Sequence, residues 1–203
     1  MIYGYQGLRT LPIDTLIRSQ YGGHFQYLTI QGLFLACATA LISLIEDLVP
    51  SGNGLRSLKR ILLITSMPVT IVISSIYWPL LFLATRLILP VEEGTTSPHA
   101  SQFIRLPLSM DFALHAAPAI SLLVDFLMLG KRLSRNELRF GTPAVSFFYT
   151  SFYAWWVERC ASFNGKFPYP FLTESSLEIR MAIYFGAGSL ALTSYWLINS
   201  LHA

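Results

Sequence analysis

The segment FQYLTIQGLFLACATALISLIEDL, residues 25–48, is apolar over more than the length of a membrane-spanning helix. The hydrocarbon core of a bilayer requires about 20 consecutive, mostly apolar residues in an α-helix. Four further runs of this kind follow, at about residues 61–89, 106–129, 143–160 and 181–201. The sequence therefore predicts an all-α integral membrane bundle of five transmembrane helices, organised as a single domain over residues 1–203.

The composition of the chain supports a membrane protein. Charged residues make up 12% of it, against roughly 25% in an average soluble domain, and the mean hydropathy is +0.52. Membrane strands alternate apolar and polar residues, whereas these runs are continuously apolar, which favours helices over strands. The net charge of +3 is spread over several loops, which argues against a nucleic-acid partner. Cys37 and Cys160 match no metal or redox spacing, so no metal or cofactor is predicted.

Residues 1–20 are too polar and too short to cross a membrane, and they lack the pattern of a signal peptide. They are expected either to lie on the membrane interface as a short amphipathic segment or to be disordered. Basic residues are packed densely into the loops after the first and third runs, which favours a cytosolic position for these two loops. No pattern in the sequence specifies an oligomeric state.

Two of the few polar side chains inside the apolar runs, Thr29 and His115, fall near the same membrane face. Since successive spans alternate in direction, the starts of the first and third spans share a face, and the two residues lie roughly 6 and 13 Å below it. Thr29 shares a helix face with the small residues Gly32 and Ala36, which let another helix approach closely. His115 shares a stripe with Asp111, and ionisable groups in a membrane face the protein interior. We therefore expect both side chains to point into the bundle.

These residue types suit a hydrolase. A threonine hydroxyl is a weak nucleophile unless a neighbouring base takes its proton, and imidazole titrates near neutral pH. Asp111, one turn before His115, is the candidate for orienting the ring. Pro118 cannot donate a backbone hydrogen bond, so a kink is expected beside the histidine. The structural alternatives are a Thr29 hydroxyl bonded to the carbonyl four residues earlier and a purely structural hydrogen bond from His115 to Asp111 or to another helix.

Three short segments resemble a known family. The residues YGG at 21–23, followed by LT at 28–29, are similar to the Y-G-G-x-x-x-x-L-T segment of the androgen-induced protein family of multispanning lipid hydrolases. The stretch DFALH at 111–115 resembles the family's histidine segment, and NG at 164–165 with YPFL at 169–172 resembles its G-x-x-x-Y-P-F-L loop. The resemblance runs in order from residue 21 to the end of the chain.

The resemblance implies a threonine hydrolase that cleaves fatty acid esters of hydroxy fatty acids. Carried over by position, the nucleophile is Thr29 and the histidine is His115. Two features depart from the family pattern. The family has a membrane helix before its Y-G-G motif, where this chain has about twenty mostly polar residues, and Asp111 stands where relatives carry asparagine.

The sequence thus predicts a hydrolase whose lipid ester substrate enters sideways from the surrounding membrane lipids. Arg86 and Arg105 are candidates for binding a substrate carboxylate, with lipid anchoring as the alternative role. Asn164, Tyr169 and backbone N–H groups are candidate oxyanion donors. The expected location is the endoplasmic reticulum or another endomembrane, with the plasma membrane as the alternative.

Two other classes of function compete with this interpretation. The same residues fit a non-enzymatic lipid-binding or regulatory membrane protein. A stripe formed by Asp111, His115 and Asp125 would instead serve proton or ion transport, which requires a polar path across the whole membrane. The remaining histidines, His24 and His99, are expected to be exposed in loops.

Overall fold

The computed structural model describes residues 1–49, 53–88 and 106–202, and no strand occurs within these ranges. The elements in chain order are α1 (Ile2–Leu8), α2 (Ile13–Ser19), η1 (Gly23–Gln26), α3 (Leu28–Leu48), α4 (Asn53–Leu83), η2 (Thr85–Leu87), α5 (Leu108–His115), α6 (Ala117–Val124), η3 (Asp125–Leu129), η4 (Glu137–Gly141), α7 (Thr142–Asn164), α8 (Pro170–Thr173) and α9 (Leu177–Leu201). The prediction of an all-helical membrane fold is confirmed for the described part of the chain.

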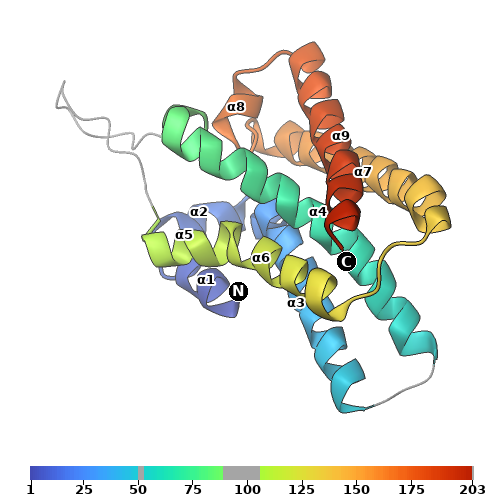
Figure 1. Cartoon of the computed structure of the whole chain (residues 1–203). Coiled ribbons are helices and arrows are strands. Elements are labelled where there is room, and N and C mark those ends of the chain that lie inside the picture. Colours follow the sequence, from blue (N-terminus) through green and yellow to red (C-terminus); the bar gives the residue numbers. More distant parts are fainter. Residues whose placement is uncertain (50–52, 89–105, 203) are drawn as a thin grey trace, which may run out of the picture.

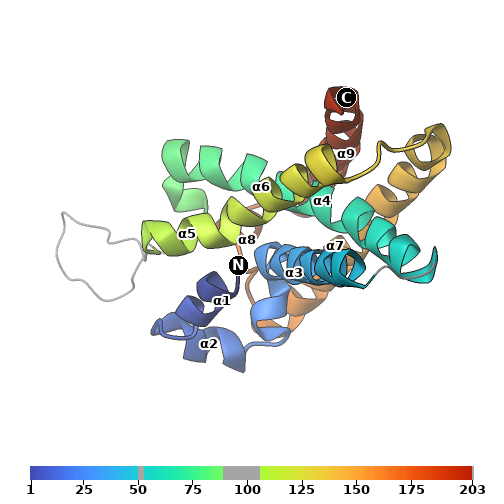
Figure 2. The same cartoon turned by 60° about the horizontal axis from the view of Figure 1, so that its bottom comes forward.

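The longest helix, α4, runs through the middle of the bundle (Figure 1). It contacts α3, α6 and α9, while α7 packs against α9 and α1 packs against α5. The same view shows α7 and α9 on one side of α4 and the pair α5 and α6, with α1 and α2, on the other, and the second view shows α1 and α2 beside α5 (Figure 2). The α4 helix therefore joins two groups of helices.

Three helices, α3, α4 and α9, are long and apolar enough to cross a membrane. The pair formed by α5 and the stretch from Ala117 to Leu129 passes the same test as one span, bent by 45°. This bend confirms the kink expected near Pro118. Helix α7 has 23 residues but is rich in hydroxyl and aromatic side chains, and it does not meet the same limit of hydropathy. Three to four spans are thus supported, and the fifth, at residues 143–160, stays a prediction.

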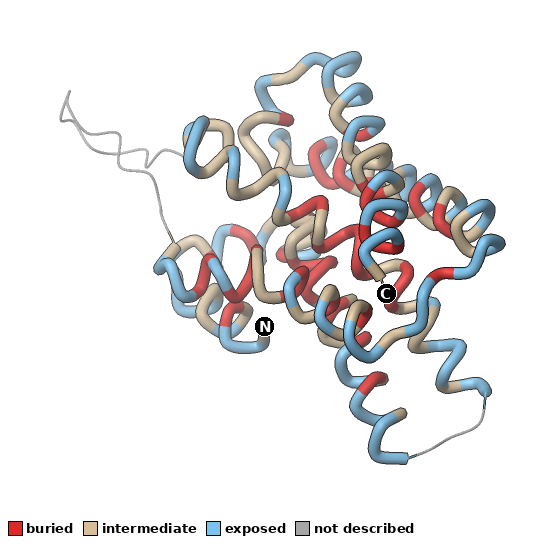
Figure 3. Tube along the Cα trace, in the orientation of Figure 1, coloured by how far each residue is buried: buried red, intermediate tan, exposed pale blue. Residues whose placement is uncertain are grey.

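Buried residues gather along α4 and where other helices cross it, and exposed residues cover the outer faces (Figure 3). Met67, Phe126 and Tyr195 are almost fully buried at the centre of this core. By contrast, Phe82, Phe185 and other large apolar side chains are exposed on the outside. An apolar outer surface of this extent fits a protein surrounded by lipid.

The small residues of α3 allow a close approach to α4, as the sequence predicted. A Cβ atom added at Gly32 would lie 2.5 Å from the Ile73 side chain. One turn and two turns further on, Ala36 and Thr39 are fully buried, and the Thr39 hydroxyl is 2.9 Å from that of Ser66. The face of α3 that carries Thr29 therefore lies inside the bundle.

The N-terminal segment is ordered as two short helices, and the disordered alternative is not what the structure shows. Helix α1 packs closely on α5, since a Cβ atom at Gly4 would lie 3.0 Å from Leu114 and one at Gly7 would lie 2.4 Å from Met110. Asp14 and Ile17 of α2 are buried. The segment therefore covers part of the bundle, and its position relative to the membrane interface stays a prediction.

Candidate functional site

A partly open cavity of about 410 Å³ lies between the N-terminal helices, the start of α3, the end of α5 and the chain around α8. Thr29 is the second residue of α3, and His115 is the last residue of α5. Both line this cavity. The structure thus brings together the two residues that the alternation of spans placed near one membrane face.

Two residues fix the His115 ring: Asp111 contacts its Nδ1 atom, and Tyr77 stacks on its face. Its Nδ1 atom lies 3.1 Å from the Asp111 carboxylate and 3.1 Å from the Asp111 carbonyl oxygen. The ring of Tyr77 stacks on the imidazole, with centroids 3.5 Å apart and planes 3° from parallel, and the Tyr77 hydroxyl donates to the Asp111 carboxylate. Since Nδ1 is engaged by Asp111, Nε2 is the nitrogen that can exchange protons with a substrate.

The backbone beside His115 explains how the ring is held at a bend. Pro118 has no N–H for the carbonyl of Leu114, so the helix is interrupted between α5 and α6. The Ser74 hydroxyl of α4 donates to the His115 carbonyl at this interruption. His115 and Asp111 are both buried, with 7% and 5% of their surfaces exposed. A buried carboxylate requires bonded partners, which Tyr77 and His115 supply.

Thr29 lies in the first turn of α3, and Tyr169 packs against it. The backbone N–H of Leu28 donates to the Tyr169 hydroxyl at 3.0 Å, and Thr29 and Tyr169 both line the cavity. The structural alternative for Thr29 required the carbonyl of Phe25, four residues earlier. That oxygen instead accepts from Gln31 and Trp156, at 2.8 and 2.9 Å. A carbonyl has two lone pairs, so these donors satisfy it.

Of the two candidate oxyanion donors, only Tyr169 lies at the cavity. Asn164 does not line it, and its side chain is bonded to the backbone N–H and carbonyl of Tyr21, at 2.8 and 3.0 Å. Asn164 therefore fastens the Y-G-G turn to the end of α7. Gly22 in that turn has φ of 82°, a conformation that favours glycine.

Comparison with known proteins agrees with the architecture. The model of the family described as FAR-17a/AIG1-like protein matches residues 2–203. The chain belongs to this family. It is 28% identical over 194 residues to a UPF0641 membrane protein of Schizosaccharomyces pombe, which covers 93% of this chain and 79% of that relative. It is also 27% identical over 164 residues to a UPF0641 membrane protein of Saccharomyces cerevisiae, covering 74% of this chain and 65% of that relative.

No solved structure matches this chain. The resemblance stated from three short motifs is thus confirmed at the level of the FAR-17a/AIG1-like family, and the relatives are membrane proteins by name.

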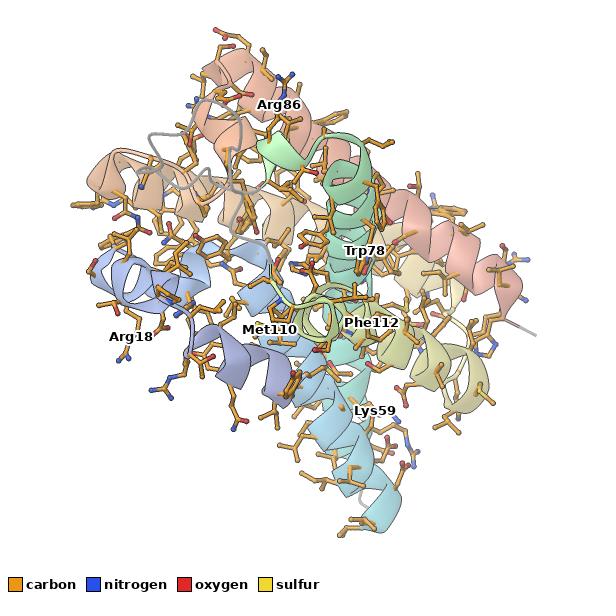
Figure 4. The ribbon with its side chains drawn as sticks, turned by 90° about the vertical axis from the view of Figure 1, so that its left-hand side faces the viewer. Arg18, Lys59, Trp78, Arg86, Met110 and Phe112 are labelled. Atoms are coloured by element: carbon orange, nitrogen blue, oxygen red, sulfur yellow. The ribbon has the colours of Figure 1, made fainter. Side chains whose placement is uncertain are left out.

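Of the two candidate carboxylate-binding residues, only Arg86 can be placed relative to the cavity. Arg86 is exposed in η2, at the end of the molecule opposite Lys59 (Figure 4), and it does not line the cavity. Arg105 lies outside the described residues. Two charged residues that the sequence analysis did not single out, Lys166 and Glu174, do line the cavity, and both are exposed. Lys166, which follows Gly165 in the third family motif, is therefore better placed than Arg86 to bind a substrate carboxylate.

His24 is buried, so the expectation that it is an exposed loop residue was wrong. Its Nε2 atom lies 2.7 Å from the Asp14 carboxylate, and the ring of Tyr5 packs edge-on against it. The pair is buried because α1 and α2 fold over the cavity, and His24 is part of the lining. His99 lies outside the described residues.

A second cavity of about 120 Å³ lies between α3, α4, α7, α8 and α9. Four residues line both cavities: Thr29, Tyr77, Ile88 and Tyr169. The candidate nucleophile therefore stands where the two cavities meet.

Sequence reasoning missed Tyr77 as well. Ser74 and Tyr77 are three residues apart in the otherwise apolar run at 61–89, which places them on one helix face. That spacing was the available signal for a partner of His115. Among the residues that the structure describes, no group of three or more His, Cys, Asp or Glu side chains is arranged to hold a metal ion.

Proposed function

We propose that this member of the FAR-17a/AIG1-like family is a membrane carboxylic ester hydrolase. Thr29 is the nucleophile, His115 is the base, and the substrates are fatty acid esters of hydroxy fatty acids. The observation that carries the proposal is that Thr29 and His115 line one cavity while Asp111 and Tyr77 fix the imidazole. The relatives' names record a membrane location and no activity, so the chemistry rests on this geometry and on the motif resemblance.

In the first half of the reaction, His115 Nε2 takes the Thr29 proton as the threonine oxygen attacks the ester carbonyl. Negative charge develops on the carbonyl oxygen, where a donor placed in advance lowers the barrier. The Tyr169 hydroxyl, beside Thr29, is our candidate for that donor. The tetrahedral intermediate then collapses, and the imidazolium returns the proton to the leaving alkoxide. The products at this stage are a free alcohol and an acyl ester on Thr29.

In the second half, His115 removes a proton from water, which attacks the acyl ester. Collapse of the second intermediate releases a fatty acid and returns the proton to Thr29. Asp111 keeps the imidazole oriented through both halves, and Tyr77 positions Asp111.

The surroundings of the site fit a lipid substrate. Most of the residues that line the larger cavity are apolar, including Leu8, Ile13, Ile17 and Ile30. A long-chain ester can enter such a cavity from the bilayer without passing through water. We place the protein in the endoplasmic reticulum or another endomembrane, with the plasma membrane as the alternative.

The ion-transport interpretation has less support. Asp125, the third member of its proposed stripe, lies 3.8 Å from Lys59 at the end of the molecule far from Arg86 (Figure 4). The bend after His115 separates it from the pair formed by Asp111 and His115.

The test is hydrolysis by purified Thr29→Ala protein, with labelling by a fluorophosphonate as a second readout. We expect the variant to lose both activities, Thr29→Ser to retain part of them, and His115→Ala to lose them as well. Thr65→Ala is the matched control, since Thr65 is on α4 and its hydroxyl bonds its own helix carbonyl at 2.9 Å. Full activity of Thr29→Ala would refute the proposal. A protein that binds lipid esters but never hydrolyses them or takes the label would be a lipid-binding protein instead.

A further inference from the structure

We infer that the two cavities hold the two halves of the ester separately, with the acyl chain in the smaller cavity and the alcohol part in the larger. This inference rests on the proposed function and assigns the substrate arms within it. Its starting point is that Thr29, Tyr77, Ile88 and Tyr169 line both cavities. An ester whose carbonyl carbon is at Thr29 has one arm on each side of that carbon. Two cavities that meet at Thr29 match this shape.

The smaller cavity is suited to a bare hydrocarbon chain. Apart from the hydroxyls of Thr29 and Thr150, its walls are mainly apolar side chains of α4, α8 and α9 together with tyrosine rings. The three tyrosines that line this cavity and not the larger one have hydrogen-bonded hydroxyls: Tyr149 donates to Gln31 at 3.1 Å, Tyr153 to the Gln26 carbonyl at 3.2 Å, and Tyr184 to Glu158 at 3.1 Å. The rings therefore offer apolar surface to an occupant.

The larger cavity carries the groups that a polar arm needs. Gln20, His24, Lys166 and Glu174 are all among its lining residues, and none of them lines the smaller one. An alcohol part that carries a carboxylate can be solvated here and can approach the Lys166 ammonium. The same carboxylate would have no partner beside the hydrocarbon walls of the smaller cavity.

The position of His115 determines which cavity holds the alcohol part and which holds the acyl chain. His115 lines the larger cavity and not the smaller. In the first half of the reaction, the bond between the carbonyl carbon and the alcohol oxygen breaks, and that oxygen must receive the proton held by His115. The alcohol oxygen therefore lies on the side of the larger cavity, and the acyl chain points the opposite way. Once the alcohol leaves, water reaches the acyl ester from the side where His115 can deprotonate it.

The smaller cavity also limits the length of acyl chain that gains from binding. An apolar cavity of about 150 Å³ stays dry and holds a benzene molecule, so a cavity of about 120 Å³ should hold on the order of six carbons. Longer chains must extend out of the cavity between the helices. Ala187 and Ala191, one turn apart on α9, leave this space open because their side chains are small.

The experiment measures kcat/KM of the whole purified protein on two series of esters. One series varies the acyl chain, and the other varies the alcohol. In the acyl series, the acid lengthens from acetyl to dodecanoyl on a constant p-nitrophenyl group. For the wild type we expect a rise of about fourfold per methylene up to about hexanoyl, followed by a plateau. In the Ala187→Phe variant the acetyl ester should keep its rate, and the rise should be lost.

The alcohol series separates the two cavities. It uses acetate esters of alkyl alcohols of increasing length, and Ala187→Phe should leave its profile unchanged. Ile13→Phe, which narrows only the larger cavity, should change the alcohol series and not the acyl series. Ala182→Phe is the matched control, because Ala182 is exposed on α9 and lines neither cavity. Ala187→Leu serves as the milder replacement if the phenylalanine variant does not fold.

The outcomes distinguish this inference from the function on which it rests. A wild type that hydrolyses no ester refutes the proposed function and the arm assignment together. An active wild type whose acyl profile is unchanged in Ala187→Phe and Ala187→Leu refutes only the assignment. A change confined to the alcohol series in these variants shows that the two arms lie the other way round.

Discussion

Replacing Tyr77 with phenylalanine should lower kcat by about tenfold to a hundredfold and leave KM nearly unchanged. Phenylalanine keeps the ring that stacks on His115, with centroids 3.5 Å apart, but loses the hydroxyl that donates to Asp111. A hydrogen bond to a charged group contributes about 1.5–3 kcal/mol, and a barrier change of about 1.4 kcal/mol alters a rate tenfold. The loss falls on kcat because Tyr77 acts by positioning Asp111, which in turn orients the base. Tyr77→Ala, which also removes the stacked ring, should be slower still.

The assay is steady-state hydrolysis of p-nitrophenyl hexanoate, with kcat and KM measured separately. Tyr3→Phe is the matched control. The Tyr3 hydroxyl of α1 lies 3.3 Å from Ser109, which is on α5 like Asp111, but this contact is exposed. That variant should behave as wild type. Equal kcat values for wild type and Tyr77→Phe would show that Asp111 does not depend on this hydroxyl, and the account of how the ring is held would fail.

Three further predictions concern other parts of the molecule. Hydrogen bonds from Arg60 lower the pKa of Glu137 from 4.5 to about 2; the ionised pair therefore stabilises the fold fully above about pH 4.5, and this contribution is lost as the pH falls toward 2. Glu137→Gln should reduce stability near pH 7 by about 1–2 kcal/mol and flatten this acid dependence in a thermal melt, whereas an unchanged acid dependence would contradict it. Gly22→Ala should destabilise the protein by about 1–3 kcal/mol in the same melt, because φ is 82° and the new Cβ would lie 2.6 Å from Cys160. Lys166→Ala should raise KM about twofold to fivefold for an ester with a free carboxylate and not for its methyl ester, and equal effects on the two would remove Lys166 from substrate binding.

Hydropathy was sufficient to predict α3, α4 and α9. Membrane insertion depends on the summed hydropathy of about 20 consecutive residues, and all of these residues belong to one helix. The kink near Pro118 was also predictable, since it follows from one missing N–H group. Helix α7 shows where this reasoning weakens. Its aromatic and hydroxyl side chains make its hydropathy ambiguous, although its length would allow it to cross.

The candidate site was predictable in part. The alternation of spans depends only on connectivity, and it placed Thr29 and His115 near one face. The roles of Tyr77 and of the pair formed by His24 and Asp14 were not predictable in this way, because they depend on helix rotation and on α1 and α2 folding over the cavity. Such contacts join residues distant in sequence, and no local pattern encodes them. Asp14 and His24 look like ordinary loop residues until the fold buries them.

The segment that connects α7 to α8 is hydrogen-bonded to the backbone at the start of α3 and just before it. The Asn164 side chain is hydrogen-bonded to the backbone of Tyr21, and the Tyr169 hydroxyl accepts from the backbone N–H of Leu28, next to Thr29. A nanobody or small molecule that displaced this connection from the bundle would move Tyr169 away from Thr29 without occupying either cavity. If the proposed hydrolase activity is correct, inhibition obtained in that way would be non-competitive with the lipid ester, because both cavities would stay free for the substrate.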